Sequence, residues 1–265
     1  MNLYESQFDR KHDVARVGDP VTTVLIASTP RCGSHMIGHA MAATGRLGVP
    51  FEYANRANMV EWMRRLGTDT PRATLDAIMQ RRTSPNRVFG IKAHFEQIAV
   101  FGSIDAFLAA LPGLRVVHLR RADILRQAVS YAFAKQTGVW IAGQEATRPK
   151  AEFDYGLIER CLTDIAIQNA QWSSAFRDRK LDVLEITYET AVLDVAVAVD
   201  RIAAFCGVLD PGQTLNAPVS TSKQSNRSRT EDWIERFVEQ SQRRPALLAR
   251  IGGAARRAIA MSGGA

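Results

Sequence analysis

The sequence predicts an α/β domain in which a mostly parallel sheet is flanked by helices on both faces. Short apolar stretches rich in β-branched residues alternate with segments whose apolar residues recur at helical spacing. The first of these stretches, Thr22–Ala27, is rich in β-branched residues and continuous in apolar character, as a strand of a parallel sheet buried on both faces is. The chain has 265 residues, the length of one large domain. We therefore expect one domain over residues 1–265, with an N-terminal extension over 1–20 and a frayed tail over 252–265.

Four stretches have the character of strands: Thr22–Ala27, Arg87–Ala93, Leu114–Leu119 and Leu181–Thr187. Helices are expected at Ser34–Thr44, Asp123–Lys135, Tyr155–Phe176, Val192–Phe205, Glu231–Ser241 and Pro245–Met261. Gly207 follows the fourth of these and is typical of a helix C-terminus. Two stretches, Phe51–Gln80 and Asp210–Thr230, do not fit the pattern. The second is rich in Pro, Ser, Thr and Asn, as a flexible connector would be.

Composition favours a soluble protein with an anionic partner. Apolar residues make up 46% and charged residues 23% of the chain, and no apolar window approaches the ~18 residues of a transmembrane helix. The charged N-terminus has no signal-peptide centre, so a cytoplasmic location is expected. The three cysteines lie far apart and form no CxxC pair, so neither a disulfide framework nor a zinc knuckle is expected; they are Cys32, Cys161 and Cys206. The net charge is +7, but its basic residues are dispersed, so a small phosphorylated or sulfated ligand fits as well as a nucleic acid.

The segment TVLIASTPRCGSHMIGHAM joins the first strand to the first helix. Ligands of parallel sheets bind beyond the carboxyl ends of strands, where helix N-termini attract anions. Gly33 allows close backbone approach, Ser34 supplies a hydroxyl, and Arg31 adds a positive charge. The junction therefore predicts a phosphate-binding loop.

Two common phosphate loops do not match this junction. An ATP-type loop requires a lysine directly before its Ser or Thr, whereas Gly33 precedes Ser34 and His35 follows it. A cysteine phosphatase would carry an arginine where Gly38 stands relative to Cys32. Kinase and phosphatase chemistry are therefore poorly supported.

A second junction, LRVVHLRRADILRQAVSYAFAKQTGVW, has the same character. Arg120 and Arg121 leave the end of a buried strand, and Ser130 lies on the following helix, where Arg126 is placed to share its face. Guanidinium groups and a hydroxyl can hold a phosphate by forked hydrogen bonds. Two anion sites at two strand ends predict one ligand with two separated phosphate groups.

Both junctions resemble those of bacterial sulfotransferases of the trehalose 2-sulfotransferase and lipopolysaccharide-sulfotransferase type. STPRCGSH is similar to the family's 5′-phosphosulfate loop, and HLRRADILRQAVSYAFAKQTGVW to its 3′-phosphate strand and helix. LEITYETAVLDVAVAVDRIAAFCGV resembles its Tyr-Glu segment, and SKQSNRSRTEDWIERF its basic C-terminal loop. The four motifs occur in the family's order and cover most of Val21–Phe237.

The resemblance implies a P-loop-like sulfotransferase fold and the donor 3′-phosphoadenosine 5′-phosphosulfate (PAPS), which leaves as adenosine 3′,5′-bisphosphate, with no metal. It implies that donor-binding residues are Arg31, Cys32, Gly33, Ser34, His35, Arg120 or Arg121, Ser130, Lys223, Gln224 and Arg227. It also implies a carbohydrate or glycolipid acceptor, no nucleic-acid partner and a homodimer.

Two features depart from the related sulfotransferases. Cytosolic eukaryotic members space the phosphate-binding arginine and serine eight residues apart, whereas Ser130 lies nine residues after Arg121 and ten after Arg120. Either arginine is therefore a candidate for the 3′-phosphate. His35 stands where a threonine is common, which removes one hydroxyl from the loop.

Sulfuryl transfer to an alcohol requires a base for the hydroxyl and positive groups on the transferred and leaving oxygens. Glu52 resembles the family's glutamate that faces the acceptor, and it is the favoured base. Lys92 and His94 would project to the same side of an extended strand. They resemble a Lys-x-His pair of eukaryotic sulfotransferases, so Lys92 is expected to stabilise the sulfuryl group and His94 is the alternative base.

Two other classes of function are compatible with the composition. An atypical P-loop nucleotide kinase would turn over ATP with magnesium, and a non-enzymatic module would bind polyanions in a salt-dependent manner. The acceptor itself is not specified by any motif, although Trp62, Arg64 and Arg65 lie in a segment expected to shape its pocket.

Overall fold

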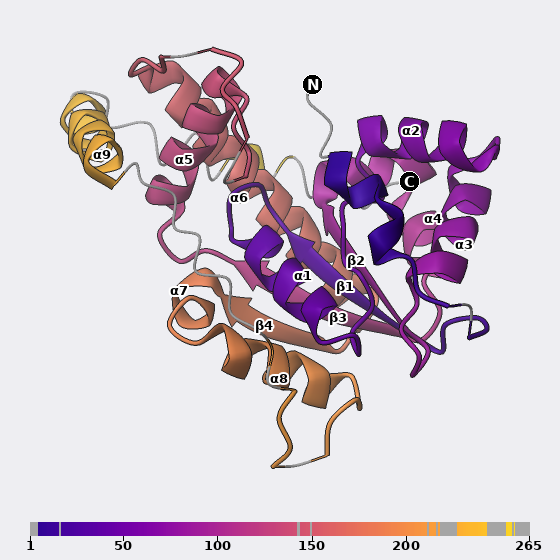
Figure 1. Ribbon diagram of the computed structural model, residues 1–265. Helices are drawn as coiled ribbons and strands as arrows, with labels where there is room; N and C mark the ends of the chain where they lie inside the picture. Colours follow the sequence, from indigo (N-terminus) through magenta and orange to yellow (C-terminus); the bar gives the residue numbers. More distant parts are fainter. Residues whose placement is uncertain are drawn as a thin grey trace.

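A four-stranded parallel sheet, in the order β2-β1-β3-β4, lies at the centre of the computed structural model (Figure 1). Its strands are β1 (Thr22–Ser28), β2 (Val88–His94), β3 (Leu114–Arg120) and β4 (Val183–Thr187). The structure describes residues 5–15, 17–141, 144–148, 150–210, 212–215, 217, 227–242, 253–255 and 257. All four predicted strands and their parallel arrangement are confirmed.

Helices cover both faces of this sheet, as predicted. Those before β3 are η1 (Glu5–Phe8), η2 (Arg10–His12), α1 (Ser34–Ala43), α2 (Arg56–Leu66), α3 (Pro71–Arg82), η3 (Phe95–Phe101) and α4 (Ile104–Ala109). Those after it are α5 (Ile124–Thr137), α6 (Tyr155–Asp178), α7 (Tyr188–Ala191), α8 (Val195–Phe205) and α9 (Arg227–Gln242).

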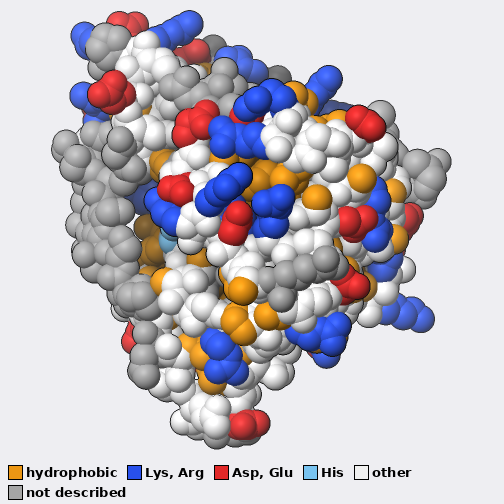
Figure 2. Space-filling model, turned by 45° about the vertical axis from the view of Figure 1, so that its right-hand side comes forward, with side chains coloured by type: hydrophobic (Ala, Val, Ile, Leu, Met, Phe, Trp, Pro, Cys, Tyr) orange, Lys and Arg blue, Asp and Glu red, His pale blue; other side chains and the backbone are white. Residues whose placement is uncertain are grey.

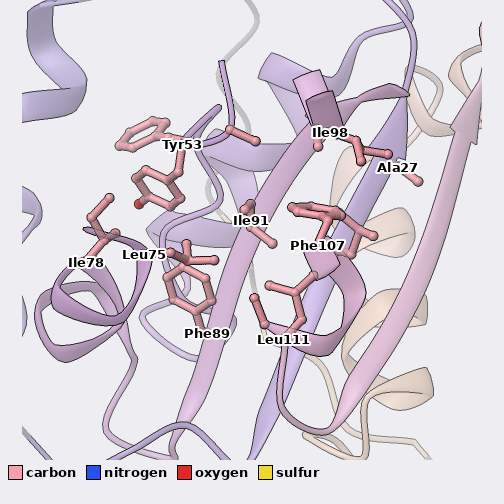
Figure 3. Packing of buried hydrophobic residues seen from close by; sticks show 14 of the residues in the cluster. Ala27, Tyr53, Leu75, Ile78, Phe89, Ile91, Ile98, Phe107 and Leu111 are labelled. Carbon is pink, nitrogen blue, oxygen red and sulfur yellow. The ribbon is translucent and has the colours of Figure 1, made fainter. Parts of the chain in front are cut away.

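The central strand β1 alternates its side chains between two apolar clusters, which explains why it is continuously apolar. In β1, Leu25 and Ala27 join a cluster that α3, α4 and α6 complete, and Figure 3 shows its side chains converging around β2. Val24 and Ile26 face the opposite cluster, which α1 and α8 complete. Burial on both faces removes apolar surface from water on each side, and this drives the strands to the centre.

The stretch that did not fit the predicted pattern, Phe51–Gln80, contains two helices with recognisable ends. The Asn55 side chain accepts hydrogen bonds from the first amides of α2, and Gly67 ends that helix in the left-handed conformation. The Thr70 hydroxyl caps α3, whose first residue is Pro71. Capping residues mark the ends of both helices in the sequence, and the apolar residues Met59, Trp62, Met63 and Leu66 recur at helical spacing within α2.

The predicted helix from Val192 to Phe205 begins later, because the Asp194 carboxylate caps α8 by accepting the Val197 amide at 3.0 Å. Gly207 has φ 68°, as a residue just beyond a helix C-terminus requires.

The C-terminal helix α9 starts four residues before the predicted Glu231 and docks on α5 and α6. Trp233 and Phe237 are buried in a third apolar cluster, where Phe237 stacks on Tyr155 with ring centroids 4.6 Å apart. Most of Asp210–Thr230 and Pro245–Met261 lies outside the described residues.

Basic and acidic side chains are interspersed on the face shown in Figure 2, rather than gathered into a broad basic field. Among the described residues, no helix combines the length and apolar character needed to cross a membrane.

Candidate active site

The carboxyl ends of the four strands meet at one edge of the sheet, because their pairing is parallel and nearly in register. Ser28 at the end of β1 pairs with His94 at the end of β2, and Arg120 at the end of β3 pairs with Thr187 at the end of β4. The segments that follow these four residues therefore converge, and they build the candidate site.

The loop between β1 and α1 is held in an unusual backbone conformation. Arg31 has φ 67°, which is uncommon for a residue with a side chain, and Gly33 has φ 90° directly before α1. A Cβ on Gly33 would lie 2.5 Å from Cδ2 of Tyr188, the residue that follows β4. Close packing on an aromatic ring, together with positive φ, explains why glycine stands here.

Arg31 connects the first junction to the second. Its Nε donates to Ser130 Oγ at 3.0 Å, and its Nη1 donates to the Trp140 carbonyl. Arg121 in turn donates from Nη1 to the Arg31 carbonyl at 3.4 Å. The two predicted anion sites are thus adjacent.

Two neighbouring guanidinium groups make this part of the site electropositive. Burial, and then repulsion from Arg121, lowers the pKa of Arg31 to about 10, so Arg31 remains charged at neutral pH. Burial also lowers the pKa of Arg121, and its nearest carboxylate oxygen, on Glu189, is 3.8 Å away. Two partly buried cations this close favour a bound anion, which would relieve both their repulsion and their lost hydration.

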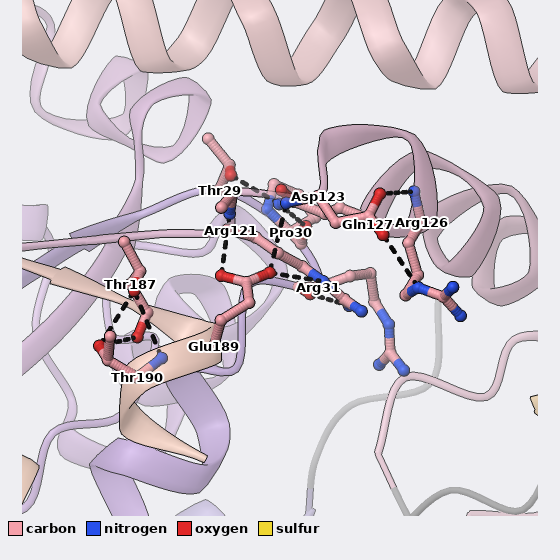
Figure 4. Close-up of polar contacts among 11 residues, drawn as sticks. Thr29, Pro30, Arg31, Arg121, Asp123, Arg126, Gln127, Thr187, Glu189 and Thr190 are labelled. Carbon is pink, nitrogen blue, oxygen red and sulfur yellow. Dashed lines mark hydrogen bonds and ion pairs between the residues drawn. The ribbon is translucent and has the colours of Figure 1, made fainter. Parts of the chain in front are cut away.

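The Tyr-Glu segment after β4 fixes the second junction. The Glu189 carboxylate accepts the Ala122 and Asp123 amides at 2.9 and 3.3 Å (Figure 4). The Tyr188 ring lies 4.6 Å from the Arg121 guanidinium carbon. Tyr188 therefore touches both junctions, since it also packs on Gly33.

Gln127 on α5 ties the first loop to the second helix. Its Nε2 donates to Thr29 Oγ1 at 2.8 Å and to the Pro30 carbonyl at 2.7 Å, and the residue is fully buried. Figure 4 shows this link beside Arg31 and Arg121.

Two of the predicted basic residues, Arg120 and Arg126, do not join the Arg31–Arg121 contact. Arg120 is exposed and helps to lower the pKa of Glu185 on β4. Arg126 forms ion pairs with Asp123 and with Glu231 on α9, instead of facing the site with Ser130. Of the two candidate arginines, Arg121 is the one in contact with the first loop.

The remaining loop residues have definite electrostatic states. Burial raises the pKa of the Cys32 thiol, so it is protonated at neutral pH and offers the site its backbone rather than a nucleophile. Ser34, at the start of α1, is buried. Burial, together with Lys92 and His39, lowers the pKa of His35 to about 2, so its imidazole is neutral.

A carboxylate lies at the end of β2, on the side of the site next to α1. The Lys92 amide donates to the Phe51 carbonyl at 3.0 Å, and this backbone contact places Glu52 beside β2. Lys92 Nζ is 3.1 Å from Glu52 Oε1, and His94 Nε2 is 3.7 Å from the same oxygen. The predicted trio Glu52, Lys92 and His94 therefore forms one cluster.

The charges within this cluster are coupled. Burial acts to raise the pKa of Glu52, but Lys92 and His94 outweigh it and lower the pKa to about 2. Burial lowers the pKa of His94, whose Nδ1 is 3.1 Å from Ser28 Oγ. At neutral pH Glu52 is thus an anion and His94 a neutral imidazole.

Several residues of the site were not predicted from the sequence. Gln97 contacts Glu52, and the His39 ring lies tilted against the His35 ring with centroids 4.1 Å apart. Spacing gave a signal for His39, which lies one helix turn after His35. Gln97 and Gln127 have no local signal, because their partners are distant in sequence. Glu189 lies in the Tyr-Glu segment that the sequence analysis singled out, but its contact with the second junction was not predicted.

The predicted C-terminal donor-binding residues cannot be placed as fully. Lys223 and Gln224 lie outside the described residues, and Arg227 is described only as the first residue of α9. In the segment expected to shape the acceptor pocket, Trp62 is 3% exposed and packs against Phe8 and Tyr53. Arg64 and Arg65 pair with Glu61.

Comparison with known proteins identifies the family of the chain. The Stf0 sulphotransferase family matches residues 23–240. A trehalose 2-sulfotransferase from Mycobacterium tuberculosis is 26% identical over 84% of this chain and 97% of its own, and one from Mycolicibacterium smegmatis is 23% identical over 86% and 98%. A solved sulfotransferase from Alicyclobacillus acidocaldarius shares the fold, with a TM-score of 0.50 at 14% identity over 89% of this chain and 97% of its own. The chain belongs to the Stf0 sulphotransferase family and is a sulfotransferase.

Proposed function

We propose that this enzyme transfers the sulfuryl group of PAPS to a hydroxyl of a sugar or glycolipid. The observation that carries the proposal is the contact between the two strand-end junctions. A donor with a 5′-phosphosulfate and a 3′-phosphate needs two adjacent anion sites, and Arg31 and Arg121 supply positive charge to both.

For the donor, we assign the 3′-phosphate to Arg121 and Ser130 and the 5′-phosphosulfate to the loop from Arg31 to His35. Arg121 is favoured over Arg120 because it contacts the first loop, whereas Arg120 is exposed. The neutral His35 imidazole can donate or accept one hydrogen bond, but it adds no positive charge.

For the chemistry, we assign Glu52 as the base that accepts the proton of the acceptor hydroxyl. The acceptor oxygen forms a bond to sulfur as the bond from sulfur to the 5′-phosphate oxygen breaks, and the proton moves to the Glu52 carboxylate. Lys92 is placed to stabilise negative charge on the transferred group.

Lys92 also controls how strong a base the Glu52 carboxylate is. While it is paired with Lys92, the carboxylate is a weak base, because its pKa is about 2. The anionic sulfuryl group competes for the same ammonium, and drawing Lys92 away would raise the pKa of Glu52 and strengthen it as a base.

For the acceptor, the trehalose 2-sulfotransferases support a sugar hydroxyl. The site can receive an acceptor hydroxyl, because Glu52 keeps 26% of its side-chain surface exposed while Lys92 and His94 are buried.

We also retain the homodimer as a proposal, which light scattering of the purified protein would test.

The test is transfer of radiolabelled sulfate from PAPS to trehalose and a panel of other sugars, with mass spectrometry of the products. Glu52→Gln is expected to lower kcat by about 100-fold or more while binding of adenosine 3′,5′-bisphosphate is retained. His94→Asn should have the smaller effect. Glu96→Gln makes the same chemical change at an exposed residue of η3 and should be near normal. Normal transfer by Glu52→Gln would refute the assignment of the base.

A further inference from the structure

A buried amide side chain lies between the proposed base and the end of β2. Gln97 on η3 donates from Nε2 to Glu52 Oε2 at 3.0 Å, and its Oε1 accepts the His94 backbone amide at 3.1 Å. The residue is 6% exposed. We propose that Gln97 is a positioning residue for sulfuryl transfer, which fixes the orientation of the Glu52 carboxylate. This inference rests on the proposed function, and in particular on Glu52 as the base.

The orientation of the Gln97 amide follows from its partners. A backbone N–H can only donate, so the His94 amide requires the Gln97 oxygen to face it. The Gln97 NH₂ group must then face Glu52 and donate to it, and an ionised carboxylate accepts this hydrogen bond more strongly than a protonated one. Gln97 therefore both positions Glu52 and favours its ionised form.

The two oxygens of Glu52 have different partners. Oε1 lies near Lys92 and His94, whereas Oε2 accepts from Gln97. When Lys92 turns to the sulfuryl group, Oε1 loses its closest partner while Oε2 keeps its own. The geometry thus assigns Oε1 as the oxygen that takes the acceptor proton, with Gln97 holding the other oxygen in place.

Loss of such positioning has a kinetic signature. A displacement of about 1 Å in a catalytic group can cost about 100-fold in rate without changing the chemistry available. Because Gln97 contacts Glu52 rather than the donor loops, its loss should lower kcat and leave the KM for PAPS unchanged.

Two variants separate positioning from a purely structural role. Gln97→Met removes both hydrogen bonds at similar volume. Gln97→Glu keeps an oxygen that can accept the His94 amide, but it replaces the donor to Glu52 with a second carboxylate. If Gln97 served only to cap η3, Gln97→Glu would behave as the wild type.

The adjacent carboxylates in Gln97→Glu are expected to share a proton, because like charges in contact cannot both ionise easily. Among the described residues, the other titratable or charged groups that face Glu52 are Lys92 and His94 from β2 and His35 from α1. His35 and His94 have lowered pKa values and Lys92 is a cation. A new titration near neutral pH would therefore report the carboxylate pair.

The primary experiment is carbon-13 NMR of carboxyl-labelled glutamate between pH 4 and pH 8, with the Glu52 resonance assigned by its loss in Glu52→Gln. Wild-type Glu52 should show no titration in this range, and Gln97→Glu should show one. Ala99→Glu adds a carboxylate at an exposed position of the same helix and should leave Glu52 unchanged.

Sulfation of trehalose from PAPS supplies the second readout. We expect kcat to fall about 100-fold in Gln97→Met and Gln97→Glu, with the KM for PAPS within twofold of wild type. The proposal would be overturned if Glu52 in Gln97→Glu showed no titration between pH 4 and pH 8, as in the wild type, and kcat of this variant also equalled that of the wild type. If the wild type fails to bind adenosine 3′,5′-bisphosphate, the proposed function fails instead, and the NMR titration still decides whether Gln97 controls Glu52.

Discussion

The glycine before α1 offers a sharp test of how the donor loop is built. Gly33→Ala places a methyl group 2.5 Å from Cδ2 of Tyr188, at a residue whose φ is 90°. Tyr188 cannot move without disturbing Arg121, whose guanidinium carbon lies 4.6 Å from its ring. The substitution should therefore destabilise the loop and displace the amides and arginines proposed to bind the donor.

The loss of folding stability in Gly33→Ala has a backbone part and a packing part, and the control variant Gly45→Ala separates them. A non-glycine residue at positive φ costs about 1 kcal/mol, and forcing a methyl group into a packed site adds about 1–3 kcal/mol. Gly45→Ala carries only the backbone cost, because Gly45 has φ 63° and a methyl group added there would meet nothing within 4 Å. We expect a loss of about 1 kcal/mol for Gly45→Ala and about 2–4 kcal/mol for Gly33→Ala.

Urea unfolding measures the loss of stability in each variant. Calorimetric titration with adenosine 3′,5′-bisphosphate measures the effect on donor binding. Each kcal/mol should lower Tm by about 2–4 °C in a domain of this size. Gly33→Ala should also weaken binding at least tenfold, whereas Gly45→Ala should bind normally. Equal stability losses in the two variants, or normal binding by Gly33→Ala, would refute this account of the loop.

Two further predictions concern ion pairs. Lys92→Met removes the strongest stabiliser of the Glu52 anion, so the pKa of Glu52 should rise and the variant should be about 3 kcal/mol less stable than wild type at pH 7. That difference should shrink as pH falls, because protonation relieves the unpaired carboxylate in the variant before it affects the wild type; a pH-independent difference in urea unfolding would contradict this. For Arg126 and Glu231, whose side chains are 31% and 46% exposed, a double-mutant cycle with alanine should give a coupling of about 0.5–1 kcal/mol that weakens at high salt. A coupling above about 2 kcal/mol would show that the contact between α5 and α9 is worth more than a solvent-screened pair.

The sheet could be predicted from sequence because its signal is local. Each strand is a short segment rich in Val, Ile and Leu, and a parallel sheet is expected once helical segments separate these strands. The helices of Phe51–Gln80 were missed because α2 and α3 are short and contain many charged residues, although the apolar residues Met59, Trp62, Met63 and Leu66 of α2 recur at helical spacing. Their ends at Asn55, Gly67 and Pro71 carried the information.

Arg31, Arg121 and His94 could be placed at strand ends from the sequence, but their contacts could not be predicted. Glu52 was proposed from the family resemblance alone. Nothing in the local sequence indicates that Arg31 reaches Ser130, which is 99 positions later, or that Glu189 holds the turn at Ala122. The role of Gln97 emerges only when the chain brings η3 beside Glu52. Long-range contacts of this kind depend on the complete fold.

The central claim is that two adjacent anion sites hold one doubly phosphorylated adenosine. Titration calorimetry with adenosine 3′,5′-bisphosphate tests it most directly, in the wild type and in the matched variants Arg121→Met and Arg120→Met. We predict a Kd in the micromolar range or tighter for the wild type, a loss of at least tenfold for Arg121→Met, and a change within threefold for Arg120→Met. Absence of binding to the wild-type protein would contradict the claim.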